Sequence, residues 1–112
     1  MDVDFAERWF GEQCNSNREL VRAYGPERAS LLRRRLDQLR AVESLDAMRF
    51  LPAHCHELTG DSEGILSVDL DGTSRLLFEP AQDPPPVKGD GGLDWSKVTA
   101  IRILREEDTH EQ

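Results

Sequence analysis

The chain has 112 residues, of which 38% are hydrophobic and 32% are charged, and its formal net charge is −8. This length predicts a single domain spanning 1–112. The composition is that of a folded protein in water and differs from that of disordered or membrane proteins. There is no run of about 18 apolar residues, and the acidic start from Met1 to Asp4 differs from a signal peptide. We therefore expect a cytoplasmic protein that makes no contact with membranes.

The negative charge lies in the second half of the chain. Residues 1–56 contain nine acidic and nine basic residues, whereas residues 57–112 contain thirteen acidic and five basic ones. The main basic stretch is Arg33, Arg34 and Arg35. An acidic protein does not attract nucleic acid through its overall field. Any contact with RNA therefore needs a local basic surface, for which these three arginines are the candidates.

The two cysteines, Cys14 and Cys55, are far apart and belong to no CxxC pair. In a reducing cytosol we expect free thiols. Neither a metal site nor a cofactor is predicted.

The first half of the chain has helical character. Asp2–Phe5 is compatible with a short strand or with the lead into a helix, and 11–17 is a polar break. A short helix is predicted for Arg18–Tyr24, ended by Gly25. Pro26 then suits the first position of a second helix.

That second helix carries an apolar stripe. The residues Ala29, Leu32, Leu36, Leu39 and Val42 recur at spacings of three and four, which predicts one buried helix face over about 17 residues. Ser44 is a candidate cap for another short helix that reaches Met48 and ends before Pro52.

The second half alternates in the manner of strands. His54–Leu58 is a candidate short strand, and Gly60-Asp61 is a turn. Leu66–Leu70 alternates apolar with polar residues and is followed by Asp71-Gly72, a strong hairpin signal. The partner strand is expected at Arg75–Glu79.

The remainder is a loop and a last strand. Four of the six prolines lie in 80–95, which predicts a long exposed loop. Val98–Leu104 is apolar on both faces and predicts a central strand. The charged tail, 108–112, is expected to fray. The order predicts an α+β fold, in which N-terminal helices pack on one face of a small antiparallel β-sheet and leave the other face free for a site.

Four blocks of the sequence resemble a known family. They are Cys55–Asp61, with a histidine before a Leu-x-Gly-Asp turn; Glu63–Val68, ending in Ser-Val; Ser74–Phe78, which contains Arg-x-x-Phe; and Glu107–His110. In this order and spacing they are similar to the HigB-like branch of the RelE superfamily, the toxins of bacterial toxin–antitoxin systems. The similarity covers about three quarters of the chain, from Pro26 to His110. Thr109 stands where the family usually has tyrosine.

The resemblance implies a RelE-like fold and a ribosome-dependent endoribonuclease that cuts mRNA without a metal. Carried over by position, the catalytic residues are His56, Arg75, Asp108 and His110. The implied partners are the ribosome with its mRNA and a cognate antitoxin, usually a helix-turn-helix protein. Operator DNA is reached only through the antitoxin.

The residue types suit that chemistry. Metal-free RNA cleavage needs a base for the 2′-OH, an acid for the leaving 5′-oxygen and a cation for the phosphate. Histidine serves the first two and arginine the third. If 54–58 is extended, His54 and His56 share a face. His54 is expected to be structural or on the surface.

Two alternatives remain open from the sequence. The superfamily also contains ParE-like toxins, which bind DNA gyrase and lack nuclease chemistry, and the net charge of −8 favours a protein target. The second alternative is a degenerate homologue that binds the antitoxin but is inactive, which Thr109 and the acidic tail favour. A positive surface around His56 and Arg75 would favour RNA over either alternative.

Overall fold

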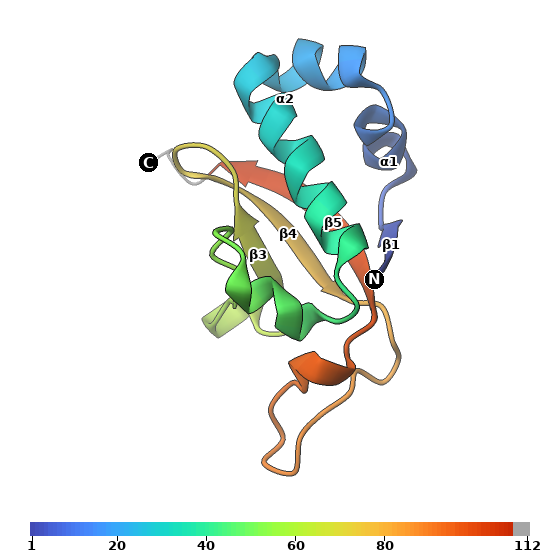
Figure 1. The fold of residues 1–112 in the computed structure, drawn as a ribbon, viewed down its shortest axis with the longest axis vertical. Coiled ribbons are helices and arrows are strands. Elements are labelled where there is room, and N and C mark those ends of the chain that lie inside the picture. Colours follow the sequence, from blue (N-terminus) through green and yellow to red (C-terminus); the bar gives the residue numbers. More distant parts are fainter. Residues whose placement is uncertain (109–112) are drawn as a thin grey trace.

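The computed structural model describes residues 1–108 and shows an α+β fold built on a mixed five-stranded sheet. In chain order, the elements are β1 (Asp2–Phe5), α1 (Arg8–Cys14), α2 (Asn17–Ala41), the 3-10 helix η1 (Leu45–Phe50), β2 (His56–Glu57), the 3-10 helix η2 (Gly60–Ser62), β3 (Leu66–Asp69), β4 (Ser74–Pro80), the 3-10 helix η3 (Trp95–Lys97) and β5 (Ala100–Asp108). The strand order is β1-β5-β4-β3-β2. The helix α2 crosses the face of the sheet that Figure 1 turns toward the viewer. We call this the helix face and the opposite one the far face.

The expectation of a wholly antiparallel sheet is wrong at one edge. The pairs β2–β3, β3–β4 and β4–β5 are antiparallel as predicted, but β1 runs parallel to β5, with Val3 opposite Ile101. In β1, the side chains of Val3 and Phe5 are half-buried, and those of Asp2 and Asp4 are exposed. This period of two is the strand signal of Asp2–Phe5.

The expected polar break at 11–17 is mostly helix, because α1 occupies Arg8–Cys14. Phe10 anchors it with 1% of its surface exposed. Gly11 lies against the ring of Phe5, where a Cβ atom would stand 3.2 Å from Cγ. Glycine weakens a helix in isolation, but here it allows α1 and β1 to approach closely.

The predicted helix break at Gly25 is confirmed. Gly25 has φ 83° and ψ 162°, a non-helical conformation within α2, and Pro26 follows it. Glycine tolerates this positive φ at little cost, and the residue before a proline avoids helical angles. The two segments that meet here were both predicted. At the start of α2, the Ser16 hydroxyl accepts a hydrogen bond from the Glu19 backbone N–H at 3.2 Å.

The core lies between α2 and the sheet. The predicted stripe is buried at Ala29, Leu32, Leu36 and Leu39, while Val42 at its end is half-buried. The sheet contributes the buried apolar residues Leu66, Val68, Leu76, Phe78, Ile101 and Ile103. No helix within residues 1–108 is long and apolar enough to cross a bilayer.

A β-bulge divides β5 into two parts of opposite phase. The adjacent residues Leu77 and Phe78 pair with Arg105 and Ile103, so Leu104 between them has no partner. Before the bulge, Ile101 and Ile103 face the core. After it, the phase shifts by one residue, and the even-numbered residues of β5 lie on the helix face. The strand also extends to Asp108, beyond the predicted end at Leu104.

The loop after β4 is exposed along much of its length, as expected, but it is anchored at its end. Trp95 is only 6% exposed, and its Nε1–H donates to Glu57 at 2.8 Å. The guanidinium of Arg49 stacks on the Trp95 ring at 3.9 Å. Together these contacts hold η3 against β2 and η1.

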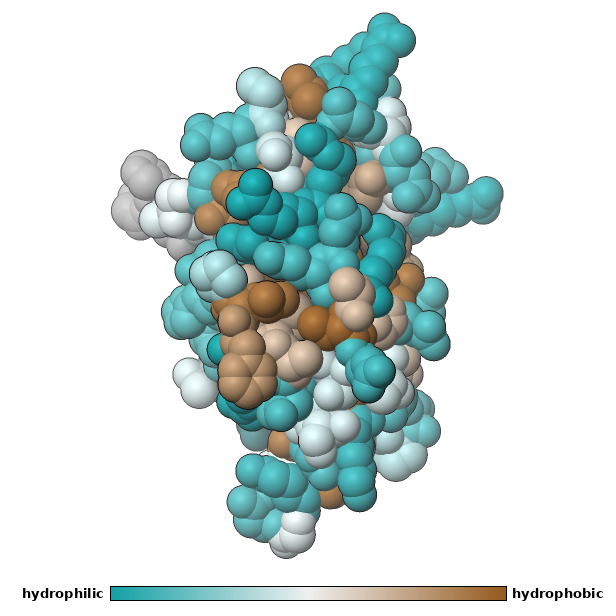
Figure 2. All heavy atoms as spheres, viewed as in Figure 1, coloured by the Kyte–Doolittle hydropathy of each residue, from teal (hydrophilic) through white to brown (hydrophobic). Residues whose placement is uncertain are grey.

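The surface over α2 is hydrophilic, and an apolar area lies beside it. Figure 2 shows apolar atoms gathered below α2, where Figure 1 places the segment around η1. Phe50, the last residue of η1, exposes 83% of its surface. Trp9, on α1, is a second exposed aromatic residue at 57%.

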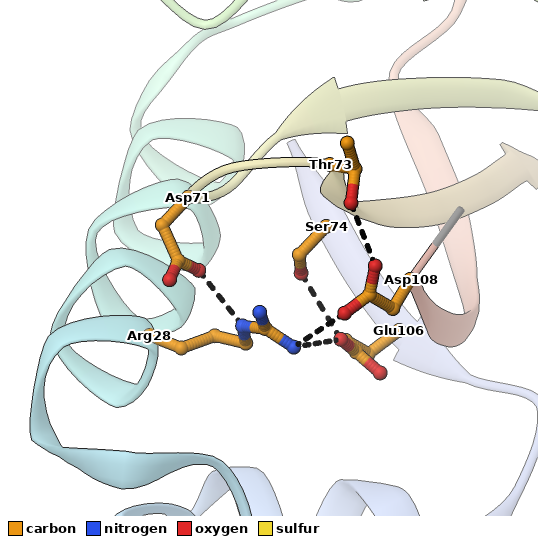
Figure 3. Close-up of polar contacts among 6 residues, drawn as sticks. All are labelled: Arg28, Asp71, Thr73, Ser74, Glu106 and Asp108. Carbon is orange, nitrogen blue, oxygen red and sulfur yellow. Dashed lines mark hydrogen bonds and ion pairs between the residues drawn. The ribbon is translucent and has the colours of Figure 1, made fainter. Parts of the chain in front are cut away.

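Arg28 on α2 gathers three carboxylates from the sheet (Figure 3). Its Nε donates to Asp71 at 2.8 Å, and its Nη1 lies 3.0 Å from Glu106 and 3.6 Å from Asp108. The hydrogen bond from Arg28 to Asp71 raises the pKa of Arg28, although burial opposes this. One guanidinium thus joins the second half of α2, the β3–β4 turn and the end of β5. We call this group the Arg28 cluster.

Two hydroxyls complete the Arg28 cluster. Ser74 donates to Glu106 at 3.0 Å, and Thr73 donates to Asp108 at 2.7 Å. Charged acceptors strengthen such bonds. The acidic end of β5 is therefore held in the sheet by partners on α2 and on the hairpin.

The first prediction tests the Arg28 cluster. Arg28→Met keeps the apolar stem but leaves three neighbouring carboxylates without their shared cation. We expect the free energy of unfolding to fall by about 2 kcal/mol, less than for a fully buried pair, because water reaches part of the group. Urea denaturation monitored by circular dichroism measures the change. Arg22→Met, at an exposed ion pair with Glu19 on the same helix, is the control and should change it by less than about 0.5 kcal/mol.

Candidate functional site

Two of the sequence-predicted site residues, His56 and Arg75, lie on the far face. His56 pairs with Ser67 across β2–β3, and Asp69 pairs with Arg75 across β3–β4. Directly opposed residues share a face, and so do residues two apart on one strand. His56 and Arg75 stand roughly 12 Å apart at Cα by ordinary strand geometry. A ligand the size of a nucleotide bridges such a distance between long side chains.

The bulge brings Glu107 to the same face beside Arg75. Arg75 and Glu107 are cross-strand partners, and Nη2 donates to the Glu107 carboxylate at 2.9 Å. Arg105, two residues earlier, approaches the other oxygen of Glu107 at 3.4 Å. Glu107 thus lies between two guanidinium groups and takes the position that an anionic ligand of Arg75 would occupy.

Carboxylates outnumber arginines among the strand residues of the far face. At the other end of the sheet, Arg102 pairs with Glu79 at 2.9 Å. The described strand residues on this face include three arginines and five carboxylates, namely Arg75, Arg102, Arg105, Asp2, Asp4, Asp69, Glu79 and Glu107. The face is therefore neither a positive patch nor a uniformly negative surface, and ion pairs are formed along it.

Two polar atoms in the middle of this face lack hydrogen-bond partners. They are Oγ of Ser67, a residue with no exposed surface, and Nε of Arg75. A buried donor without an acceptor costs about 1–3 kcal/mol. Ser67 lies directly between His56 and Leu77 in the strand register. Both atoms are enclosed by the protein, so they are shielded from a ligand as well as from water.

The imidazoles of His54 and His56 stack at one edge of the far face. Their ring centroids are 4.2 Å apart, and the planes meet at 21°. His54 Nδ1 lies 3.2 Å from Oδ2 of Asp69, and His56 Nδ1 lies 2.9 Å from the backbone oxygen of His54. His54 has φ 51°, a left-handed conformation. Both rings are thus held by neighbours on the same face.

Asp108, the third predicted residue, lies on the helix face. It pairs with Ser74, which precedes Arg75 and so faces the opposite side of β4. Its carboxylate belongs to the Arg28 cluster. The sheet therefore separates Asp108 from His56 and Arg75. The fourth predicted residue, His110, and the neighbouring Thr109 lie outside the described residues.

The three consecutive arginines of α2 do not share one surface. Arg35 is only 7% exposed, and its Nε donates to the backbone oxygen of Asp69 at 2.7 Å. Burial, with a smaller effect of Arg34, lowers the pKa of Arg35. Arg33 and Arg34 are exposed, and Arg33 donates to Asn17. The basic surface expected from the sequence thus reduces to Arg33 and Arg34, while Arg35 ties α2 to the end of β3.

Neither cysteine forms a disulfide, as expected. Burial raises the pKa of Cys14 to about 11 and that of Cys55 to about 12. Since the thiolate is the nucleophile, Cys55 is unsuited to nucleophilic chemistry despite its position between two histidines. Within residues 1–108, no three His, Cys, Asp or Glu side chains form a group that could hold a metal ion.

Sequence reasoning missed the burial of Ser67 and the position of Glu107 beside Arg75. Ser67 was expected on the solvent side of a half-buried strand, but it is buried. Glu107 is placed beside Arg75 by the bulge at Leu104, for which the sequence carries no local signal. Two signals in the sequence could have placed Ser67. The alternation of Leu66–Leu70 and the hairpin at Asp71-Gly72 together indicate that Ser67 lies on the strand that pairs with the strand of Arg75.

Neither the scan against models of known protein families nor the search of curated proteins finds a match for this sequence.

The second prediction concerns the two thiols. At pH 8, a rise in pKa from 9.0 to about 12 lowers the thiolate fraction of Cys55 on the order of a thousandfold. We expect iodoacetamide to modify the native protein far more slowly than the urea-unfolded protein, as followed by mass spectrometry. Rapid native modification at Cys55 would show that the thiol is not held as its burial indicates.

Proposed function

We propose that this protein is the toxin of a bacterial toxin–antitoxin pair, in the HigB-like branch of the RelE superfamily with its RelE-like fold, and that it cuts mRNA on the ribosome without a metal. The observation that carries the proposal is the convergence of His56 and Arg75, from separate strands, on one face of the sheet. These are two of the four residues that the family resemblance singles out.

In this proposal, the roles follow from the hydrogen bonds of each residue. His56 has Nδ1 against a backbone oxygen, which is only an acceptor, so the proton of the neutral ring resides on Nδ1. Nε2 then carries the lone pair and takes the proton of the 2′-OH. Arg75 stabilises the charge that builds on the phosphate, for which its planar fork is suited.

The remaining expectations from the resemblance belong to the same proposal. The protein acts in the cytoplasm, binds a small antitoxin of the helix-turn-helix type, and reaches operator DNA only through that antitoxin. Arg33 and Arg34 on the outer side of α2 are the exposed basic residues available for RNA in this segment.

A second candidate function has support of its own. Arg75 is already paired with Glu107, and the far face has no excess of positive charge. Both observations favour a toxin that binds a protein target, as ParE-like toxins do, or a homologue that has lost cleavage and retains antitoxin binding.

The third prediction separates these functions at Arg75. Arg75→Ala should abolish toxicity in induced bacteria and reduce mRNA cleavage by purified protein on translating ribosomes about 100- to 1000-fold, the usual cost of losing a group that stabilises the transition state. Primer extension locates and quantifies the cut. Because the pair of Arg75 with Glu107 is partly buried, circular dichroism checks that the variant remains folded.

The control is Arg102→Ala, which removes the same type of residue from the same face. Its pair with Glu79 has the same 2.9 Å length as that of Arg75 with Glu107. We expect near-normal cleavage from this variant. If the wild-type protein arrests growth while mRNA stays intact, the nuclease proposal is rejected in favour of a protein target.

The fourth prediction concerns Glu107 as a competitor of the phosphate. Glu107→Gln removes the negative charge between Arg75 and Arg105 while keeping the shape of the side chain. We expect tighter binding of a short RNA and a lower KM for cleavage, because the phosphate no longer displaces a carboxylate. Glu79→Gln, the equivalent change beside Arg102, should leave both quantities nearly unchanged. Equal effects of the two variants would mean that only net charge matters.

A further inference from the structure

The histidine pair at the edge of the far face contains a residue without an assigned role. His54 exposes 67% of its side chain and stacks on His56 with 4.2 Å between ring centroids. Both rings use Nδ1 toward the protein, one to the Asp69 carboxylate and one to the backbone oxygen of His54. These contacts leave both Nε2 atoms as the ring nitrogens available to a ligand.

The two rings differ in the charge of the group that holds them. His54 has a carboxylate as its partner, which suits a positively charged imidazolium. His56 has a neutral carbonyl, which suits a neutral imidazole protonated on Nδ1. The hydrogen-bond partners therefore suit His54 as a proton donor and His56 as a proton acceptor.

The backbone at His54 is held in a conformation that few non-glycine residues adopt. Its φ of 51° lies in the left-handed region, where strain commonly accompanies functional sites. This turn directs the carbonyl of His54 to the ring of His56 and also brings the His54 ring within reach of Asp69. One unusual residue thus fixes both rings.

We propose that His54 is the general acid of the reaction and that Asp69 is its positioning residue; this inference rests on the proposed nuclease function. Nε2 of His56 takes the proton from the 2′-OH as the 2′-oxygen bonds to phosphorus. The bond from phosphorus to the 5′-oxygen breaks, and that oxygen takes the proton from Nε2 of His54. The products are a 2′,3′-cyclic phosphate and a 5′-hydroxyl, and one proton has passed from His54 to His56. Exchange with water restores the starting forms.

The variant that tests this assignment is His54→Asn. Asparagine tolerates the left-handed conformation, and its amide donates to Asp69 in place of Nδ1. It offers no acidic proton at the position of Nε2. We expect cleavage of ribosome-bound mRNA to slow by 100-fold or more, the usual contribution of a general acid. His54→Gly, which also accepts the positive φ, serves as a second variant, and circular dichroism checks the fold of each.

A substrate with a better leaving group distinguishes proton donation from a structural role. The mRNA carries a single sulfur in place of the bridging 5′-oxygen at the mapped cut, and a thiolate departs without protonation because thiols are far more acidic than alcohols. We expect His54→Asn to cleave this RNA within a few-fold of the wild-type rate. His56→Asn, which lacks the base, should remain slow on both substrates.

Each outcome decides the assignment. Rescue of the His54 variants alone supports it. Normal cleavage of ordinary mRNA by His54→Asn overturns the role of His54 and leaves the nuclease function standing. Slow cleavage of both substrates by both His54 variants also overturns it, since the ring then acts through structure. A wild-type protein that cuts neither RNA refutes the nuclease function and this assignment with it.

Discussion

The unpaired Leu104 in β5 is the constraint on which the arrangement of this molecule depends. One strand must fill the core with Ile101 and Ile103 and then contribute charged residues to both faces of the sheet. The shift of one residue at Leu104 decides which of these charged residues lies on which face. Beyond it, Glu107 lies beside Arg75 on the far face, and Glu106 lies with Arg28 on the helix face. Without the bulge, Glu106 and Glu107 at the end of β5 would exchange faces.

The sequence predicts those parts of the fold that depend on local pattern. The stripe on α2, the break at Gly25 and the hairpin at Asp71-Gly72 are all confirmed, because each follows from helical period or backbone preference. The parallel pairing of β1 with β5 was not predicted, since it joins opposite ends of the chain. The helix α1 was missed because Gly11 lowers its helix propensity. The close contact with the ring of Phe5 explains why a glycine stands at this position.

Less of the candidate site can be derived from the sequence. His56 and Arg75 were named, and the structure places them on one face. The position of Asp108 on the other face depends on the bulge, which no local pattern announces. Arg35 differs from its neighbours only by its phase on α2, which turns it into the core. His54 was expected to be structural or on the surface, and it is exposed, but its stacking on His56 through a left-handed turn was not predicted, since 54–58 was taken as extended.

The pairing of β1 with β5 has a consequence for how the molecule is made. Asp2–Phe5 is synthesised before Ala100–Asp108, and the sheet is complete only when these two segments meet. Contacts that close almost the whole chain form slowly, because the entropy of the intervening loop is lost before they contribute stability. During translation, β1 therefore has no strand to pair with until β5 has been synthesised. Until then, the backbone N–H and C=O groups of β1 that pair with β5 have no partners in the sheet.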